Sequence, residues 1–130
     1  MKKILFVLAC FFTLQANAQK HSTMNTDKLT NDIVKKAINA LQAGDKQAWT
    51  ALFTADAEMF DDGRKIDLKS FSNDAVGHER FTSIDKVENS GLDVYGRFHS
   101  DRWGDFKTYF KFHPNKDGKI TRLEIGQANY

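Results

Sequence analysis

The stretch INALQAGDKQAWTALFTADAEMFDDG, residues 38–63, decides the fold, because it ends one helix, holds a second and enters a strand. Gly44 closes a helix whose apolar residues recur at helical spacing from Leu29 onward. Asp45 suits an N-cap, and the apolar residues that include Trp49 and Phe53 predict a second, short helix. ADAEMFDDG then predicts a brief strand that runs into an Asp-Asp-Gly turn.

The chain after this stretch changes its period from helical to alternating. A third helix is predicted over residues 67–76, before Gly77. Residues 79–130 predict three or four strands, separated by turn signals at 89–91, 102–105 and 115–118. Helices followed by a meandering sheet predict an α+β fold in which the helices cover one face of an antiparallel sheet.

The first twenty residues, MKKILFVLACFFTLQANAQK, have the pattern of a secretory signal peptide. A basic start precedes a short apolar run, and Ala16 and Ala18 form an A-x-A cleavage site. The apolar run is too short to span a bilayer comfortably. We therefore expect cleavage after residue 18, a mature domain over 19–130, and export to the periplasm or the medium without a membrane anchor. Acylation of Cys10, as in a lipoprotein, is the alternative.

Composition limits the number of domains and the kind of partner. The chain has 130 residues, of which 41% are hydrophobic and 28% charged, as expected for one globular domain. Loss of residues 1–18 removes Lys2 and Lys3 and leaves 17 basic and 17 acidic side chains, a formal net charge of zero. A nucleic-acid partner is therefore not expected.

The sequence lacks the motifs of several common chemistries. Cys10, the only cysteine, leaves with the signal peptide, so the mature chain has neither a disulfide nor a cysteine nucleophile. No nucleophile elbow, P-loop or dinucleotide fingerprint is present. We expect no cofactor.

The segment HPNKDGKITRLE, residues 113–124, comes within one residue of the calcium-binding EF-hand pattern. Only His113 fails the pattern, at the position where an aspartate is expected. The flanking residues alternate as strands do, whereas an EF-hand loop joins two helices. We interpret Asn115 to Gly118 as the turn of a β-hairpin and predict no metal site.

The stretch at 38–63 and the closing segment FHPNKDGKITRLEIGQ, residues 112–127, resemble the nuclear transport factor 2-like superfamily. That superfamily includes SnoaL-like polyketide cyclases and ketosteroid isomerases. The resemblance covers nearly all of the mature chain and implies a cone-like, cystatin-like roll, in which a strongly curved sheet wraps around helices and leaves a pocket. It also implies that a homodimer is common.

The resemblance permits a test of one activity. In the isomerase branch a carboxylate base follows the first strand, and Asp61 matches it. The oxyanion donors of that branch would fall near Ala37 and near Phe106 or Lys107, none of which can act as a neutral acid. Steroid-type isomerisation is therefore disfavoured. Asp61 is equally well explained as an ordinary turn residue.

Strand alternation sorts the second half of the chain into two faces. The inner face supplies candidate ligand-binding residues. Trp49 and Phe53 of the predicted helices could also contact a ligand, or they could belong to the core. Those on the strands are Phe98, Thr108 and Phe110.

The outer face carries a basic and aromatic group of residues. This group could bind a partner, form the dimer interface or be simply solvated, since aromatic residues and Arg are common at interfaces. Its members are Tyr95, Arg97, His99, Tyr109 and Lys111. His78 could be catalytic, but no second His lies at ligand spacing beside it, which favours a surface role.

These observations lead to three functional hypotheses. The first is an exported domain that binds a small, largely apolar molecule without catalysis. The second is a small isomerase, cyclase or hydrolase with Asp61 as general base. The third is an interaction module that works through the outer face.

Overall fold

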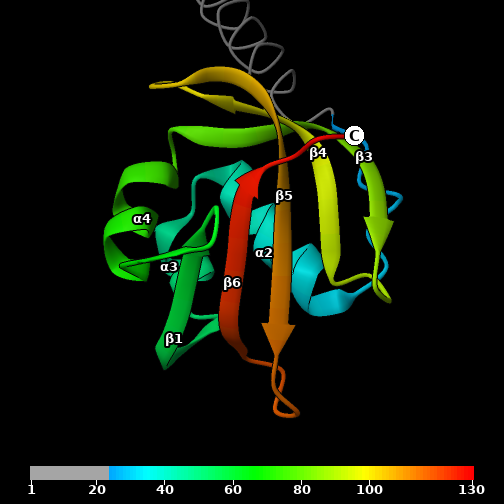
Figure 1. Ribbon diagram of the computed structural model, residues 1–130. Helices are drawn as coiled ribbons and strands as arrows, with labels where there is room; N and C mark the ends of the chain where they lie inside the picture. Colours follow the sequence, from blue (N-terminus) through cyan, green and yellow to red (C-terminus); the bar gives the residue numbers. More distant parts are fainter. Residues whose placement is uncertain (1–23) are drawn as a thin grey trace, which may run out of the picture.

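The computed structural model describes residues 24–130, so the predicted signal peptide and Cys10 lie outside the described residues. A curved six-stranded sheet wraps around three helices (Figure 1). The chain therefore has the α+β architecture that the sequence predicts, with the helices on the concave side of the sheet.

Each helix begins at a polar side chain that accepts backbone N–H groups. In α2, Asp32–Ala43, Asn31 accepts from Ile33 and Val34, and Gly44 ends the helix with φ 69°. Asp45 caps α3, Lys46–Thr50, as predicted. Asp67 caps α4, Leu68–Ala75, within one residue of the predicted end.

Two boundary predictions are wrong. Leu29 precedes α2 instead of lying on it, although its side chain is buried. Phe53 is the first residue of a strand and not part of the second helix, because α3 ends at Thr50.

The sheet has the order β2-β1-β6-β5-β4-β3. Every neighbouring pair is antiparallel except β1 and β6, which run parallel. Four strands follow α4, in agreement with the alternating pattern, and the three-residue β2 was not predicted. The strands are β1 Phe53–Asp61, β2 Arg64–Ile66, β3 Glu79–Glu88, β4 Asp93–Ser100, β5 Gly104–Pro114 and β6 Ile120–Gln127.

The EF-hand-like segment joins two strands. Asn115 accepts from the backbone N–H groups of Asp117 and Lys119, and Gly118 has φ 81°, so the chain reverses between β5 and β6. The predicted hairpin is confirmed.

The space between sheet and helices is filled at one end of the cone. Trp49 packs on Phe53 with ring centroids 5.0 Å apart, and its indole N–H donates to the Ser72 hydroxyl at 2.9 Å. Ile120 pairs with Phe53 at the same end, and its side chain is buried. At the opposite end, inner-face side chains line a cavity.

Candidate functional site

The cavity lies on the side of the sheet where several strand ends meet, some of them first residues and some last. The register pairs Glu79 at the start of β3 with Ser100 at the end of β4, and Thr108 near the start of β5 with Gln127 at the end of β6. Asp61 ends β1 beside Ile125. Helix α4 covers the edge from the other side. The fold therefore collects residues far apart in the sequence around one opening.

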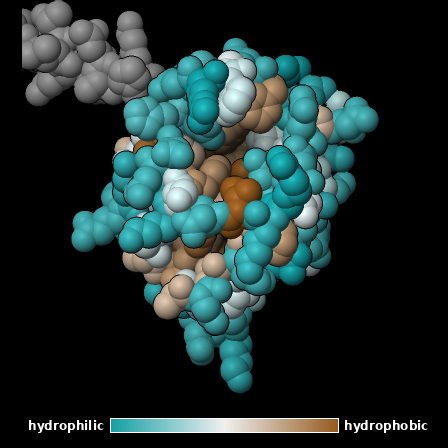
Figure 2. Space-filling view, turned by 60° about the vertical axis from the view of Figure 1, so that its left-hand side comes forward, coloured by the Kyte–Doolittle hydropathy of each residue, from teal (hydrophilic) through white to brown (hydrophobic). Residues whose placement is uncertain are grey.

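The cavity measures about 1130 Å³ and opens to solvent. Its apolar lining includes the side chains of Phe71, Phe98, Phe106, Phe110 and Ile125. Figure 2, which brings the α4 and β1 side forward, shows a hollow with an apolar floor and a hydrophilic rim. An apolar cavity with a few polar groups at its wall is the usual form of a small-molecule site.

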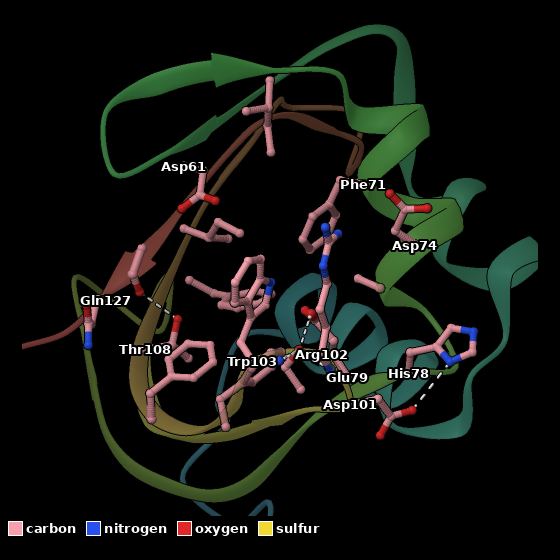
Figure 3. A pocket seen from close by; sticks show the side chains of 18 of the residues that line it. Asp61, Phe71, Asp74, His78, Glu79, Asp101, Arg102, Trp103, Thr108 and Gln127 are labelled. Carbon is pink, nitrogen blue, oxygen red and sulfur yellow. Dashed lines mark hydrogen bonds and ion pairs between the residues drawn. The ribbon is translucent and has the colours of Figure 1, made fainter.

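Asp61 faces into this cavity (Figure 3). Its carboxyl group makes no hydrogen bond or ion pair within residues 24–130. Burial raises the pKa of Asp61, the Asp62 carboxylate adds to the rise, and Arg64 opposes it. A half-buried carboxyl group with a raised pKa can accept a proton or bind a cation.

Glu79 is a second carboxyl group on the cavity wall, half-buried and set apart from Asp61 in the close-up view (Figure 3). Burial raises its pKa, and the charges of Asp61 and Asp101 add to the rise. The Ser100 hydroxyl opposes this rise, because it donates to Glu79 Oε2 at 2.8 Å.

The turn between β4 and β5 forms part of the cavity mouth. Ser100 Oγ accepts the backbone N–H groups of Arg102 at 3.2 Å and Trp103 at 3.0 Å. The Arg102 guanidinium lies 4.9 Å from the centre of the Trp103 ring. Trp103 is 69% exposed. An exposed tryptophan at the mouth offers an apolar surface to an entering molecule.

His78 lies at the same mouth and is exposed. Its Nδ1 is 3.4 Å from Asp101 Oδ2, and His99 Nε2 is 3.3 Å from Asp101 Oδ1. The fold thus brings together two histidines that sequence spacing keeps apart. Among residues 24–130, no group of three or more His, Cys, Asp or Glu side chains could hold a metal ion.

The predicted ligand-binding residues fall into two places. Phe98, Thr108 and Phe110 line the cavity, and Thr108 Oγ1 donates to the Gly126 carbonyl at 2.6 Å. Trp49 and Phe53 are buried in the filled end and do not line the cavity, so their position matches the core alternative.

The basic and aromatic group lies on the convex side of β4 and β5, where the register pairs Tyr95 with Tyr109. Arg97 is exposed, whereas His99 is held by Asp105 at 2.6 Å. Tyr130 folds onto this face with its ring 6.0 Å from that of Tyr95, and the chain's own C-terminal residue covers part of it.

Sequence reasoning missed Glu79, Ser100 and the residues that α4 contributes. Glu79 and Ser100 lie two residues from Phe81 and Phe98, so alternation extended to the strand ends would have placed both on the inner face. Nothing in the sequence indicates that α4 covers this edge, since that contact depends on tertiary packing.

No protein-family model and no curated protein matches this chain. Solved structures do match, at low identity. An NTF2-like protein of unknown function from Cytophaga hutchinsonii is 17% identical over 80% of this chain and 95% of its own, with a TM-score of 0.62. A putative polyketide cyclase from Sinorhizobium meliloti is 22% identical over 74% and 94%, with a TM-score of 0.59.

The Anabaena orange carotenoid protein, solved with canthaxanthin, is 18% identical and has a TM-score of 0.63. The match covers 82% of this chain and only 39% of that protein. Together these likenesses define the class of fold: the chain has the nuclear transport factor 2-like cone, which is also described as cystatin-like in a neighbour from Xanthomonas campestris.

Proposed function

We propose that this protein binds a small, largely apolar molecule in the open end of the cone, without catalysis. The observation that carries the proposal is the cavity of about 1130 Å³, whose lining combines aromatic and aliphatic side chains with a few polar groups. The fold supports it, since the similar orange carotenoid protein binds canthaxanthin.

Nile red, a neutral apolar dye that fluoresces in apolar surroundings, tests the proposal. We expect saturable binding that Phe106→Ala weakens by about tenfold, because a cavity-lining ring is lost. Phe106 is half-buried, so its removal disturbs the core less than removal of Phe110.

Phe60→Ala is the matched control. Phe60 is also a half-buried phenylalanine, but it packs on Arg122 and does not line the cavity. Equal loss of affinity in the two variants, or no saturable binding to the wild type, contradicts the proposal.

One observation favours a second candidate, an isomerase, cyclase or hydrolase that uses Asp61 as general base. Asp61 and Glu79 line one cavity, and burial raises the pKa of both, which makes each a stronger base than an exposed carboxylate. Solvent deuterium exchange into the α-position of cyclohexanone, followed by NMR, tests it. Exchange that is lost in Asp61→Asn supports the enzyme, and unchanged exchange excludes Asp61 as the base.

We further propose export, on the signal-peptide pattern of residues 1–18. The mass of the intact protein from the exported fraction tests it, since cleavage after Ala18 leaves a chain that begins at Gln19. Among the described residues, no helix has both the length and the apolar character that a membrane crossing requires.

A further inference from the structure

The cavity has an unequal distribution of charge. Seven carboxyl side chains line it, against one guanidinium, that of Arg102, and the imidazole of His78. The carboxyl groups are those of Asp61, Asp62, Asp67, Asp74, Glu79, Asp101 and Asp105. The whole chain, in contrast, has a formal net charge of +2. The acidic character therefore belongs to this opening and not to the protein in general.

Four of these carboxyl groups have a role in the fold. Asp62 accepts the Gln127 N–H, Asp67 caps α4, and the remaining two, Asp101 and Asp105, contact His99. A structural explanation is therefore available for them.

Of the other three, Asp74 is exposed on α4, whereas Asp61 and Glu79 are half-buried on the inner face of the sheet, at the end of β1 and the start of β3. Three strands separate β1 from β3 in the sheet, which curves around the helices (Figure 1). Asp61 and Glu79 nevertheless line the same cavity. Neither carboxyl group has a cationic side chain within 4.0 Å among residues 24–130. An ionised carboxylate in a partly apolar site costs free energy unless a positive charge lies beside it, so a cationic ligand would be favoured here.

Ser100 determines the hydrogen-bonding role of the Glu79 carboxylate. Its oxygen already accepts two backbone N–H groups, and its single hydrogen is directed to Glu79 Oε2. This hydrogen bond holds Glu79 as an acceptor. The carboxylate oxygens of Glu79 and Asp61 that have no donor can therefore accept hydrogen bonds from a positively charged ligand.

We propose that the cavity selects an amphipathic organic cation, with a protonated amine in the field of the wall carboxylates Asp61 and Glu79 and a compact hydrocarbon body on Phe98, Phe106 and Ile125. This inference rests on the proposed binding function and names the chemical class of its ligand. The apolar floor supplies affinity, and the two carboxylates supply selectivity for the cation. The charge of Arg102 favours the ionised form of Glu79, but its guanidinium lies over the Trp103 ring at the mouth and forms no ion pair within 4.0 Å with either carboxyl group.

Three probes of the same shape test the charge of the ligand separately from its apolar body. They are 1-adamantanamine, 1-adamantanol and 1-adamantanecarboxylate, each titrated calorimetrically at neutral pH and low ionic strength. We expect the amine to bind at least about tenfold more tightly than the alcohol, and the carboxylate most weakly.

Variants then assign the selectivity to the two carboxyl groups. Asp61→Asn and Glu79→Gln should each weaken amine binding by about tenfold while the affinity for the alcohol changes by less than about twofold. Asp56→Asn is the matched control, because Asp56 is an exposed aspartate of the same strand that does not line the cavity. Circular dichroism checks that each variant is folded.

Each outcome of the titrations has a defined meaning. Equal affinity for amine and alcohol, or preference for the carboxylate, overturns the cation assignment and leaves the proposed binding function standing. An amine preference that survives in both variants also overturns it. Failure of all three probes to bind overturns the cation assignment and the proposed function together.

Discussion

Asp61 and Asp62 are neighbours in the chain with different surroundings. Asp62 has φ 49°, its N–H donates to the Ile125 carbonyl at 2.9 Å, and its carboxylate accepts the Gln127 N–H at 3.1 Å. The turn is therefore held by Asp62. Asp61 remains in the strand and faces the cavity. Of the two explanations that the sequence left open for Asp61, the pocket residue therefore describes Asp61, and the turn residue describes its neighbour Asp62.

The raised pKa of Asp61 predicts a pH-dependent effect of Asp61→Asn on stability. The folded pKa lies above the ordinary value of 3.8, so the folded state binds more protons than the unfolded state between the two values. The contribution of Asp61 to stability is thus greatest in acid and falls as the pH rises through the folded pKa. Asparagine does not ionise, so its contribution to stability does not fall as the pH rises.

We therefore expect Asp61→Asn to match the wild type in acid and to be more stable at neutral pH, by less than about 1 kcal/mol because water screens a half-exposed group. Urea unfolding across this pH range measures the difference, with Asp56→Asn as control. A difference that does not vary with pH, or a less stable variant at neutral pH, contradicts the account.

Ser100 connects the cavity wall to the turn at its mouth. Ser100→Ala removes the donor to Glu79 and the acceptor for two backbone N–H groups at a site that is 1% exposed. We expect a loss of about 1 to 3 kcal/mol in the free energy of unfolding. Thr82→Ala, at an exposed position of β3, should change it by less than about 0.5 kcal/mol, and equal effects would disprove the role of Ser100.

At the scale of elements, Gly96 permits the curvature of the β3–β4 pair. It lies opposite Ile84, between two register shifts of β3, and a Cβ at this position would collide with the Ser83 carbonyl oxygen. Such shifts bend a strand and increase its twist. The glycine is therefore required by the close approach of the two strands.

Gly96→Ala should lower the free energy of unfolding by about 1 to 3 kcal/mol, because the backbone of β3 must move away. Thr82→Ala, at an exposed position of β3, should have an effect within about 0.5 kcal/mol. Thermal or urea unfolding of both variants measures this. Tolerance of alanine at 96 would contradict the close approach.

Local signals predicted much of the fold, whereas features set by distant pairing were not predicted. Gly44 and Asp45 end and begin helices through their own conformation and side chain, and alternation placed Phe98 and Phe110 inside. The parallel pairing of β1 with β6 and the short β2 have no such local signal. Phe53 was assigned to a helix because its spacing from Trp49 suits a helix equally well.

The cavity could be predicted only in part for the same reason. Inner-face residues within the strands follow from period 2, but the neighbours of Asp61 across the cavity depend on curvature. The contribution of α4 to the wall depends on packing that no periodicity specifies.

At the scale of the whole molecule, one face of the sheet is occupied by the helices and the cavity, and the other is covered only in part, by Tyr130. We predict a homodimer through the outer face around Tyr95, Arg97 and Tyr109, because aromatic residues and arginine are favoured at interfaces. Sedimentation velocity should show a dimer that Arg97→Glu converts to a monomer. Lys116→Glu, in the β5–β6 turn, is the control. A wild-type monomer at all concentrations would disprove the dimer.

The central claim is that the open end of the cone is a binding site. An NMR titration of the isotope-labelled protein with neutral 1-adamantanol tests it most directly, because amide shifts locate the bound molecule. We predict saturable shifts that cluster at Asp61, Phe106 and Thr108 on the cavity wall. Shifts confined to the outer face around Tyr95 and Arg97, or no saturable shift at all, would contradict the account.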